Sequence, residues 1–216
     1  MHSKLHRVAA VGLLWVCLAV VGACLEPETA LAIEEPRFQT LTEDGDFSLR
    51  RYAPMIIAET EVAGSLERAS STGFRRIAAY IFGDNHAPSD THAASGNHTA
   101  EPHASEKISM TAPVTTVAAD GGWRVNFVMP AEYTMSTLPR PNDANVRLQE
   151  VPAGSMAVIR FSGLVDVDKI AAKTALLRGW MASRHLEAAG EARLARYNPP
   201  WTLPFFRRNE ILIPCR

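Results

Sequence analysis

Cysteine, net charge and catalytic motifs are all scarce in this sequence of 216 residues. Only three cysteines occur, and Cys17 and Cys24 both lie in an apolar segment near the N-terminus. A body that keeps only Cys215 forms no internal disulfide, so a packed core must hold its fold. The 22 basic and 23 acidic side chains give a formal net charge of -1. This balance excludes an overall field that steers the chain toward nucleic acid.

The sequence after residue 32 also lacks the common catalytic motifs. It contains no Gly-x-Ser-x-Gly, His-Glu-x-x-His, Gly-x-x-x-x-Gly-Lys or Cys-x-x-Cys pattern. We therefore expect a binding protein rather than an enzyme. A hydrolase or other modifying enzyme is the alternative, with Glu132 or Glu210 as a carboxylate that faces a pocket.

The N-terminal segment has the charge order of a secretory leader. Lys4 and Arg7 precede 18 uncharged residues at positions 8–25. We predict a leader over residues 1–32 and an exported body over residues 33–216. An uncleaved anchor is a further possibility, because about 18 apolar residues is the lower limit for spanning a bilayer.

Two cleavage points fit this leader. The sequence VGAC at 21–24 resembles a bacterial lipobox, in which Cys24 becomes the acylated first residue. The sequence ALA at 30–32 is an ordinary cleavage site before Ile33. The first predicts a membrane-anchored lipoprotein and the second a periplasmic protein.

The body combines short β-type runs with two amphipathic helices. Of the whole chain, 47% is hydrophobic and 21% charged, which is typical of one globular domain. Apolar residues at intervals of three and four predict helices over 66–81 and 167–189, with Gly83 and Gly190 as stops. Runs rich in β-branched and aromatic residues predict strands at 47–52, 55–62, 111–118, 123–129, 147–151, 155–161, 192–197 and 210–213.

A faint internal repeat relates the two helices. The sequences AETEVAG at 58–64 and AVIRFSG at 157–163 both end in glycine just before a helix, at an offset of 99 residues. Two copies of strand, helix and following strands predict an α+β fold. We expect a distorted β-barrel of two pseudo-symmetric halves, each with one α-helix packed outside.

The sequence KISMTAPV at 107–114 resembles the central signature of the SOUL haem-binding protein family. Further segments similar in type and order are SLRRY at 48–52, AYIFGDN at 79–85, VNFVMP at 125–130, YNPPW at 197–201 and FRRNEI at 206–211. The resemblance therefore extends over nearly the whole body. It implies a barrel of two repeated halves, in agreement with the repeat, and reversible binding of haem or another tetrapyrrole.

The resemblance also implies a binding patch beside the first helix and the loop before the last strand. Haem needs an apolar face and cations for its two carboxylates. The residues expected to supply these are Arg68, Phe74, Arg75, Arg76, Ile77, Ala78, Ile81, Tyr197 and Trp201. Arg207 and Arg208 are either a solvated edge or a second place where propionates would bind. The alternative for Phe74, Ile77 and Ile81 is the core face of an amphipathic helix.

A histidine-rich insert departs from the family pattern. Residues 86–106 separate the GDN turn from KISM, and their small polar composition predicts a surface loop. His86, His92, His98 and His103 match no standard metal spacing, although imidazoles on such a loop are candidate ligands for haem iron, zinc or copper. A solvated loop without specific function is the alternative.

We expect an exported carrier, buffer or scavenger of haem at the cell envelope. A sensing or interaction module for another planar hydrophobic ligand, or for a protein partner, is the competing hypothesis.

Overall fold

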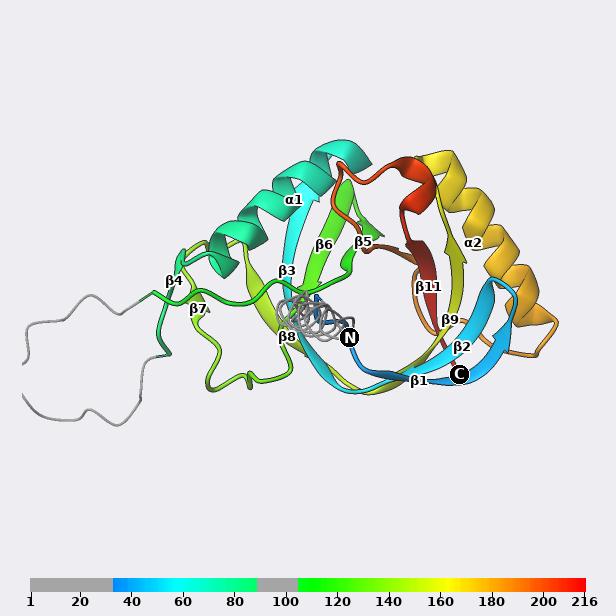
Figure 1. The fold of residues 1–216 in the computed structure, drawn as a ribbon, viewed down its shortest axis with the longest axis horizontal. Coiled ribbons are helices and arrows are strands. Elements are labelled where there is room, and N and C mark those ends of the chain that lie inside the picture. The colour runs from blue at the N-terminus through cyan, green and yellow to red at the C-terminus, as the bar shows by residue number, and fades with distance from the viewer. Residues whose placement is uncertain (1–32, 89–104) are drawn as a thin grey trace, which may run out of the picture. The chain divides into compact units, whose positions relative to one another are not determined.

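One curled antiparallel sheet of nine strands carries two helices on its outer side (Figure 1). The computed structural model describes residues 33–88 and 105–216. The strands of the sheet are β1 (Phe38–Asp44), β2 (Phe47–Tyr52), β3 (Met55–Ala63), β5 (Val114–Ala119), β6 (Gly122–Val128), β8 (Arg147–Val151), β9 (Gly154–Phe161), β10 (Arg193–Arg196) and β11 (Asn209–Cys215). The helices are α1 (Leu66–Ile81) and α2 (Val167–Ala182), and the short elements are β4 (Asn85–His86), β7 (Arg140–Pro141) and the 3-10 helix η1 (Pro204–Phe206).

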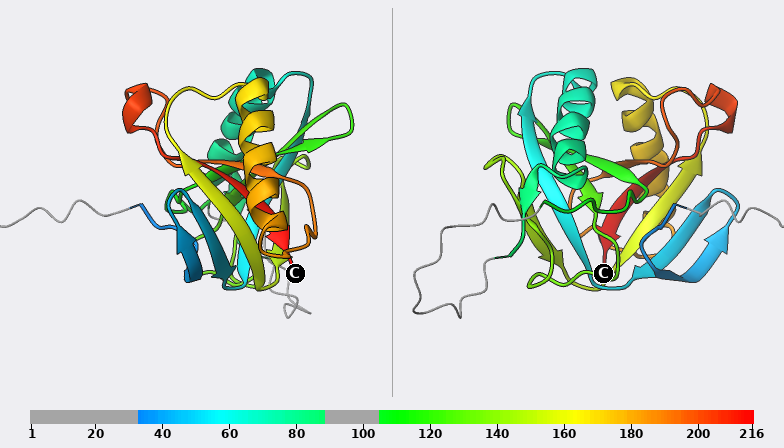
Figure 2. Two further views of the ribbon diagram at one scale, coloured as in Figure 1. Left: turned by 90° about the vertical axis from the view of Figure 1, so that its right-hand side faces the viewer. Right: turned by 60° about the vertical axis from the view of Figure 1, so that its left-hand side comes forward.

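The order of the strands makes the sheet a half-barrel. It runs β1-β2-β9-β11-β10-β5-β6-β3-β8, and each neighbouring pair is antiparallel. Both helices cover the convex side, and the concave side faces away from them (Figure 2). This is the expected α+β class, with one helix outside each half. Among residues 33–88 and 105–216, no helix combines the length and the apolar character needed to cross a membrane.

The two halves repeat the same strand-to-helix turn. Gly64 and Gly163 follow β3 and β9 with φ of +99° and +98°, a left-handed conformation that favours glycine. Ser65 and Asp166 then cap α1 and α2, and their side chains accept hydrogen bonds from the backbone of Arg68 and Lys169. The matching glycines and caps explain why the repeat is visible in the sequence.

Each helix closes its own core against the sheet. Ile77, Ile81 and Tyr80 of α1 pack with Val125 and Phe127 of β6. Leu177, Trp180 and Met181 of α2 pack with the helix-facing residues of β9 and β11. A third, smaller cluster lies on the concave face and contains Tyr52, Val158, Ala195 and Leu212. The sheet is therefore buried on both faces near its centre.

The second helix is shorter than the sequence predicts. It ends at Ala182, and the prediction of helix to residue 189 is wrong for the segment that follows. The Ser183 hydroxyl donates to the Trp180 carbonyl at 2.8 Å, and His185 takes a left-handed φ of 57°. The chain reverses there, so Leu186 packs against the α2 core from a loop and not from a further helical turn.

The sequence analysis also did not predict the edge strand β1. Every residue of Phe38–Asp44 is exposed, so no alternation of buried and exposed side chains marks it. Its position comes from pairing with β2, including an irregularity between Thr40 and Thr42.

Candidate functional site

The inward residues of α1 belong to the core. Ile77 and Ile81 expose 0% and 1% of their surface, and Ala78 is also buried. The sequence allowed either a core role or a ligand-binding role for these residues, and the structure assigns them to the core. Because the sheet covers them, they leave no apolar surface for a ligand.

The outward residues of α1 divide between two flanks. Arg76 donates to the Glu61 carbonyl at 3.1 Å and lies near the Thr60 hydroxyl at 3.5 Å, so it points toward β3. Ser70 accepts from Arg196 of β10 at 2.6 Å, on the opposite flank. The strand order places β5 and β6 between β10 and β3, so these two flanks lie on opposite sides of α1.

Phe74 lies on the flank of Ser70. The two residues are four apart and therefore share one face of the helix. Phe74 is partly exposed, and its ring packs tilted against Phe127 with centroids 5.5 Å apart. Arg68 and Arg75 are exposed on the outer side of the helix. Of the residues expected in the patch, Phe74, Arg68 and Arg75 are therefore exposed, whereas Arg76 points toward β3.

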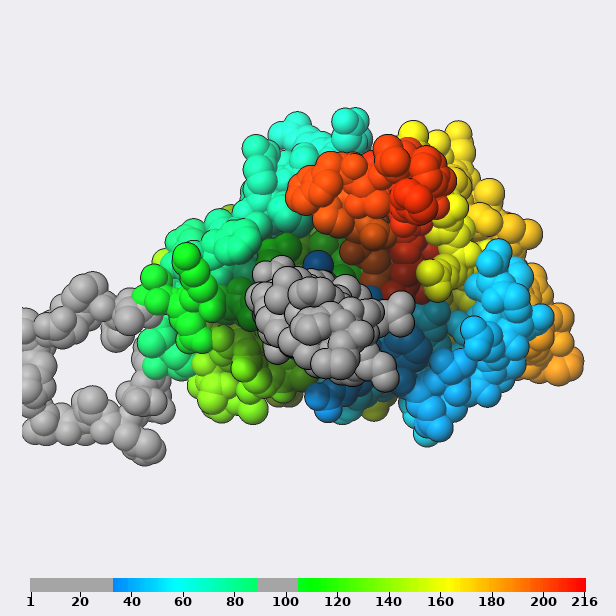
Figure 3. Space-filling view, in the orientation of Figure 1, coloured from blue at the N-terminus to red at the C-terminus, as the bar shows by residue number. Residues whose placement is uncertain are grey.

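An aromatic loop precedes β11. Trp201 is 82% exposed, and Leu203, Phe205 and Phe206 expose 56%, 65% and 69%. The rings of Phe205 and Phe206 lie 4.4 Å apart. In Figure 3, the orange and red atoms of this segment stand between the teal atoms of α1 and the yellow atoms of α2. So many large exposed apolar side chains in one loop are typical of a binding surface.

Hydrogen bonds hold this loop in one shape. The backbone of Gly163 donates to the Pro204 carbonyl at 2.8 Å, and Asn209 donates to the Gly163 carbonyl at 3.0 Å. Arg207 donates from Nε to the Thr202 carbonyl at 2.7 Å. The exposed rings therefore stand on a fixed support, which lowers the entropy cost of binding.

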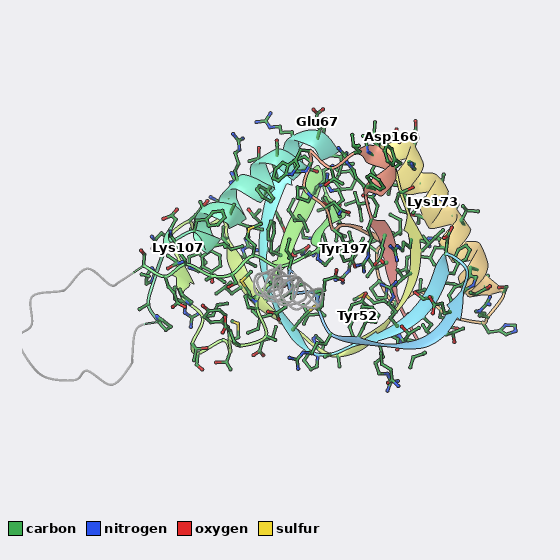
Figure 4. All side chains as sticks on the ribbon, viewed as in Figure 1. Tyr52, Glu67, Lys107, Asp166, Lys173 and Tyr197 are labelled. Atoms are coloured by element: carbon green, nitrogen blue, oxygen red, sulfur yellow. The ribbon has the colours of Figure 1, made fainter. Side chains whose placement is uncertain are left out.

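Tyr197 lies on the concave face of the sheet. Its hydroxyl donates to Glu210 Oε2 at 2.7 Å, and the guanidinium of Arg208 lies 3.6 Å from its ring centroid. Tyr52 shares this face, and Figure 4 shows both tyrosines in the middle of the curled sheet. The Tyr197 hydroxyl is therefore engaged in the Glu210 network, whereas Trp201 is exposed in the aromatic loop.

Glu210 is the centre of a buried ionic network. Its side chain has no exposed surface, and Arg50 binds both carboxylate oxygens, at 2.9 and 3.2 Å. Arg208 also donates to Glu210 at 3.2 Å and pairs with Glu35 at 2.9 Å. Burial alone would raise the pKa of Glu210, but the hydrogen bonds and charge of Arg50 hold this pKa below its ordinary value. Burial raises the pKa of the Tyr197 hydroxyl.

The other carboxylate singled out by the sequence, Glu132, is exposed. It borders an open cavity of about 470 Å³ together with Glu34, Glu35 and Ser109. A neighbouring groove of about 580 Å³ lies between the ends of β3, β6 and β8 and contains Met55, Val128 and Val151.

The structure describes one of the four histidines of the insert. His86 lies in β4, and its Nδ1 is 2.7 Å from Asn142 Oδ1. His92, His98 and His103 lie outside the described residues, as does Cys24. Among the residues that are described, no group of three or more His, Cys, Asp or Glu side chains is placed to hold a metal ion.

Asn85 joins the two ends of the insert. Its amide donates to the carbonyls of Tyr80 and Glu106, at 2.7 and 2.8 Å, and accepts from the backbone N–H of Glu106 at 3.0 Å. One buried side chain therefore ties the end of α1 to the segment that leads to β5.

The structure also contains a candidate site residue that the sequence analysis missed. Arg196 is half-buried at the end of β10, bonds to Ser70 of α1 and pairs with Asn209 at the start of β11, just after the aromatic loop. A lone arginine at the end of a short strand gives no sequence signal, because its partners come from distant segments.

Comparison with known proteins gives one family. The SOUL heme-binding protein family matches residues 33–214. No curated protein matches the sequence. Among solved structures, the C-terminal domain of EcmrR has a TM-score of 0.56 at 12% identity, covering 83% of this chain and 98% of that one.

Two proteins from Listeria innocua have similar folds. One is a hydrolase, with a TM-score of 0.53 at 10% identity over 82% of this chain and 94% of that one. The other is an uncharacterized conserved protein, with a TM-score of 0.51 at 11% identity over 78% and 92%. At these identities the likeness shows a shared fold and nothing about function.

Proposed function

We propose that this chain, which belongs to the SOUL heme-binding protein family, binds haem or a related tetrapyrrole reversibly on its aromatic loop. We further propose that it does so at the cell envelope as a carrier, buffer or scavenger. The observation that carries the proposal is the rigid, exposed aromatic loop, in which Trp201, Phe205 and Phe206 all present their rings to solvent.

The residues of this surface fit a tetrapyrrole ring. A porphyrin is flat and apolar, and aromatic side chains bury large area against such a ligand. Phe74 and the exposed Arg75 on α1 add an apolar edge and a cation. The open position of the loop favours reversible binding, because an exposed ring surface covers only part of the ligand.

The same residues bind the ring and not the iron. The described side chains of this surface include no imidazole, thiolate or thioether, and the Tyr197 hydroxyl is bonded to Glu210. When bound, haem supplies the redox chemistry of its own iron. The chain's residues orient the ring and its carboxylates. We therefore expect similar affinities for haem and for iron-free protoporphyrin.

The ionic network supports a binding role over catalysis. Both oxygens of Glu210 accept charge-assisted hydrogen bonds from arginine, so this carboxylate is held as an ion and is not available as a general acid. Buried ion pairs of this kind position strands. We propose that Glu210 joins β2 and β11 on the concave face.

The envelope location rests on the leader at residues 1–32. If Cys24 is acylated, the protein partitions into the detergent phase and Cys24→Ser abolishes that partitioning. A soluble product that begins at Ile33 would instead establish cleavage after Ala32.

A titration of the purified full chain in mild detergent tests the binding proposal. Absorbance is followed for haem and for protoporphyrin with the parent, Trp201→Ser and Phe206→Ser. Phe82→Ser is the matched control, because Phe82 is 58% exposed at the end of α1. We expect each loop variant to weaken binding about tenfold, as fully burying one such side chain is worth about 1.5–3 kcal/mol.

Absence of saturable binding by the parent would overturn the proposal. Equal losses in the loop variants and in Phe82→Ser would move the site away from the loop. Much stronger binding of haem than of protoporphyrin would show that iron ligation, and not ring packing, dominates. Binding of flat apolar dyes but not of tetrapyrroles would favour the sensing alternative.

A further inference from the structure

Arg196 carries a positive charge that no carboxylate of the described residues neutralises. Its Nη2 donates to the hydroxyl of Ser70 at 2.6 Å and lies 3.5 Å from that of Thr116. The ion pairs of residues 33–88 and 105–216 involve Arg50, Arg184 and Arg208. Nη1 and Nε of Arg196 have no acceptor among those residues. A guanidinium stays protonated in proteins, so the charge persists.

A second guanidinium belongs to Arg207, two residues before Asn209, which pairs with Arg196 across β10 and β11. Arg207 holds the aromatic loop through the Thr202 carbonyl and likewise forms no ion pair with a described carboxylate. Burial lowers the pKa of Arg196, and repulsion by Arg207 lowers it further. Two like charges brought together without an anion are unfavourable, and a carboxylate placed between them would relieve the repulsion.

The sheet register places Arg196 near the apolar edge of the site. Arg196 pairs with Val114 across β10 and β5, and Val114 pairs with Phe127 across β5 and β6. The Cα atoms of Arg196 and Phe127 are therefore about 10 Å apart, two strand spacings. Phe74 packs on Phe127, so Arg196 and Phe74 lie on the same helix-covered face of the sheet.

We infer that Arg196, with Arg207 beside it, binds a free carboxylate of the ligand that the aromatic loop holds. This inference rests on the proposed function and deepens it, because it limits the ligand class to planar apolar molecules with free carboxylates. The fork of a guanidinium donates in parallel to both oxygens of a carboxylate. Arg76 cannot serve this purpose, because it donates to β3 on the other flank of α1.

Protoporphyrin and its dimethyl ester provide the test. The two probes share the ring, but the ester has no free carboxylate. We titrate each into the full chain in mild detergent and follow porphyrin fluorescence. The parent should bind the free acid about tenfold more tightly than the ester, as expected for one charge-assisted contact.

Arg196→Gln should remove this discrimination. It should bind the free acid about tenfold more weakly than the parent does and bind the ester as the parent does. Arg193→Gln is the matched control, because Arg193 lies on the same strand and burial also lowers its pKa. Arg193 pairs with Val117 and Leu212, and Leu212 belongs to the concave cluster, so this residue faces away from the loop.

Three results would overturn the inference. The parent could bind acid and ester equally, Arg196→Gln could weaken both probes to the same extent, or Arg193→Gln could act like Arg196→Gln. In all three cases the proposed function stands as long as the parent binds porphyrin. If the parent binds neither the acid nor the ester, both the inference and the proposed function are refuted. If Arg196→Gln does not fold, Arg196→Lys keeps the charge and should retain preference for the acid, and loss of that preference overturns the inference.

Discussion

Replacing Gly73 with alanine should lower the stability of the body, although alanine is the better helix former. A Cβ atom at Gly73 would lie 2.6 Å from Cγ2 and 2.8 Å from Cβ of Val125 on β6. Carbon atoms pack favourably at about 3.5–4.0 Å, so α1 must move away from the sheet. The Cβ of Val125 is fixed to the backbone, so no rotamer change relieves the contact.

The magnitude follows from two opposing effects. Overpacking costs about 3 kcal/mol at its upper end, and the gain in helix propensity is about 1 kcal/mol. We expect a net loss of about 2 kcal/mol, which lowers Tm by about 4–8 °C for a body of this size. Thermal unfolding followed by circular dichroism measures this change.

The second helix provides the control. Gly179 of α2 has no atom within 4 Å of the position of an added Cβ and is exposed. Gly179→Ala should therefore raise stability by about 1 kcal/mol. In a Val125→Ala background, Gly73→Ala should cost at least about 1 kcal/mol less than in the parent. A Gly73→Ala variant as stable as the parent would refute the reasoning.

Three further predictions concern buried polar groups and the insert. Glu210→Gln should destabilise the body by about 3–5 kcal/mol at pH 7, because it leaves Arg50 without its partner. The pKa of Glu210 is held below its ordinary value, so its contribution is present above about pH 4.3 and is lost as the pH falls through the folded-state pKa. Urea unfolding should show the two proteins converging below about pH 4, and a gap independent of pH would contradict this. Asn85→Ala should cost about 2 kcal/mol in the same measurement, because the buried carbonyl of Tyr80 and the part-buried backbone groups of Glu106 lose their partner. Deletion of residues 89–104 should leave Tm within about 2 °C, because Asn85 already joins the segments on either side and loop-closure cost changes slowly with length; a large drop would show that the insert stabilises the body.

Local sequence signals were sufficient for most of the fold. The period of apolar residues predicted α1, and the glycines before both helices predicted the repeated halves, because each signal acts within a few residues. The prediction failed after Ala182, where Leu186 fits a helical period but is buried from a loop. Tertiary packing determines the conformation of that segment. The period of apolar residues cannot tell a side chain buried from a helix from one buried from a loop.

The candidate site was less predictable, because it depends on which face of a strand meets a helix. Arg196 and Tyr197 are neighbours in the sequence, so their side chains alternate between faces. Arg196 reaches α1 and Tyr197 reaches Glu210 on the concave side. Only the pairing of β10 with β5 and β11 shows which of the two side chains faces α1. The sequence alone fits equally well with Tyr197 toward the helix and Arg196 toward the concave side.

The central place of β11 has a consequence for the order of folding. Without Asn209–Cys215, the sheet consists of two separate groups, β1-β2-β9 and β10-β5-β6-β3-β8, because β11 lies between β9 and β10. The pairs that Arg50 and Glu35 form with Glu210 and Arg208 span 160 and 173 residues of chain. The entropy cost of closing such long loops is offset only when the last strand docks. During translation the sheet thus stays incomplete until its C-terminal strand has left the ribosome.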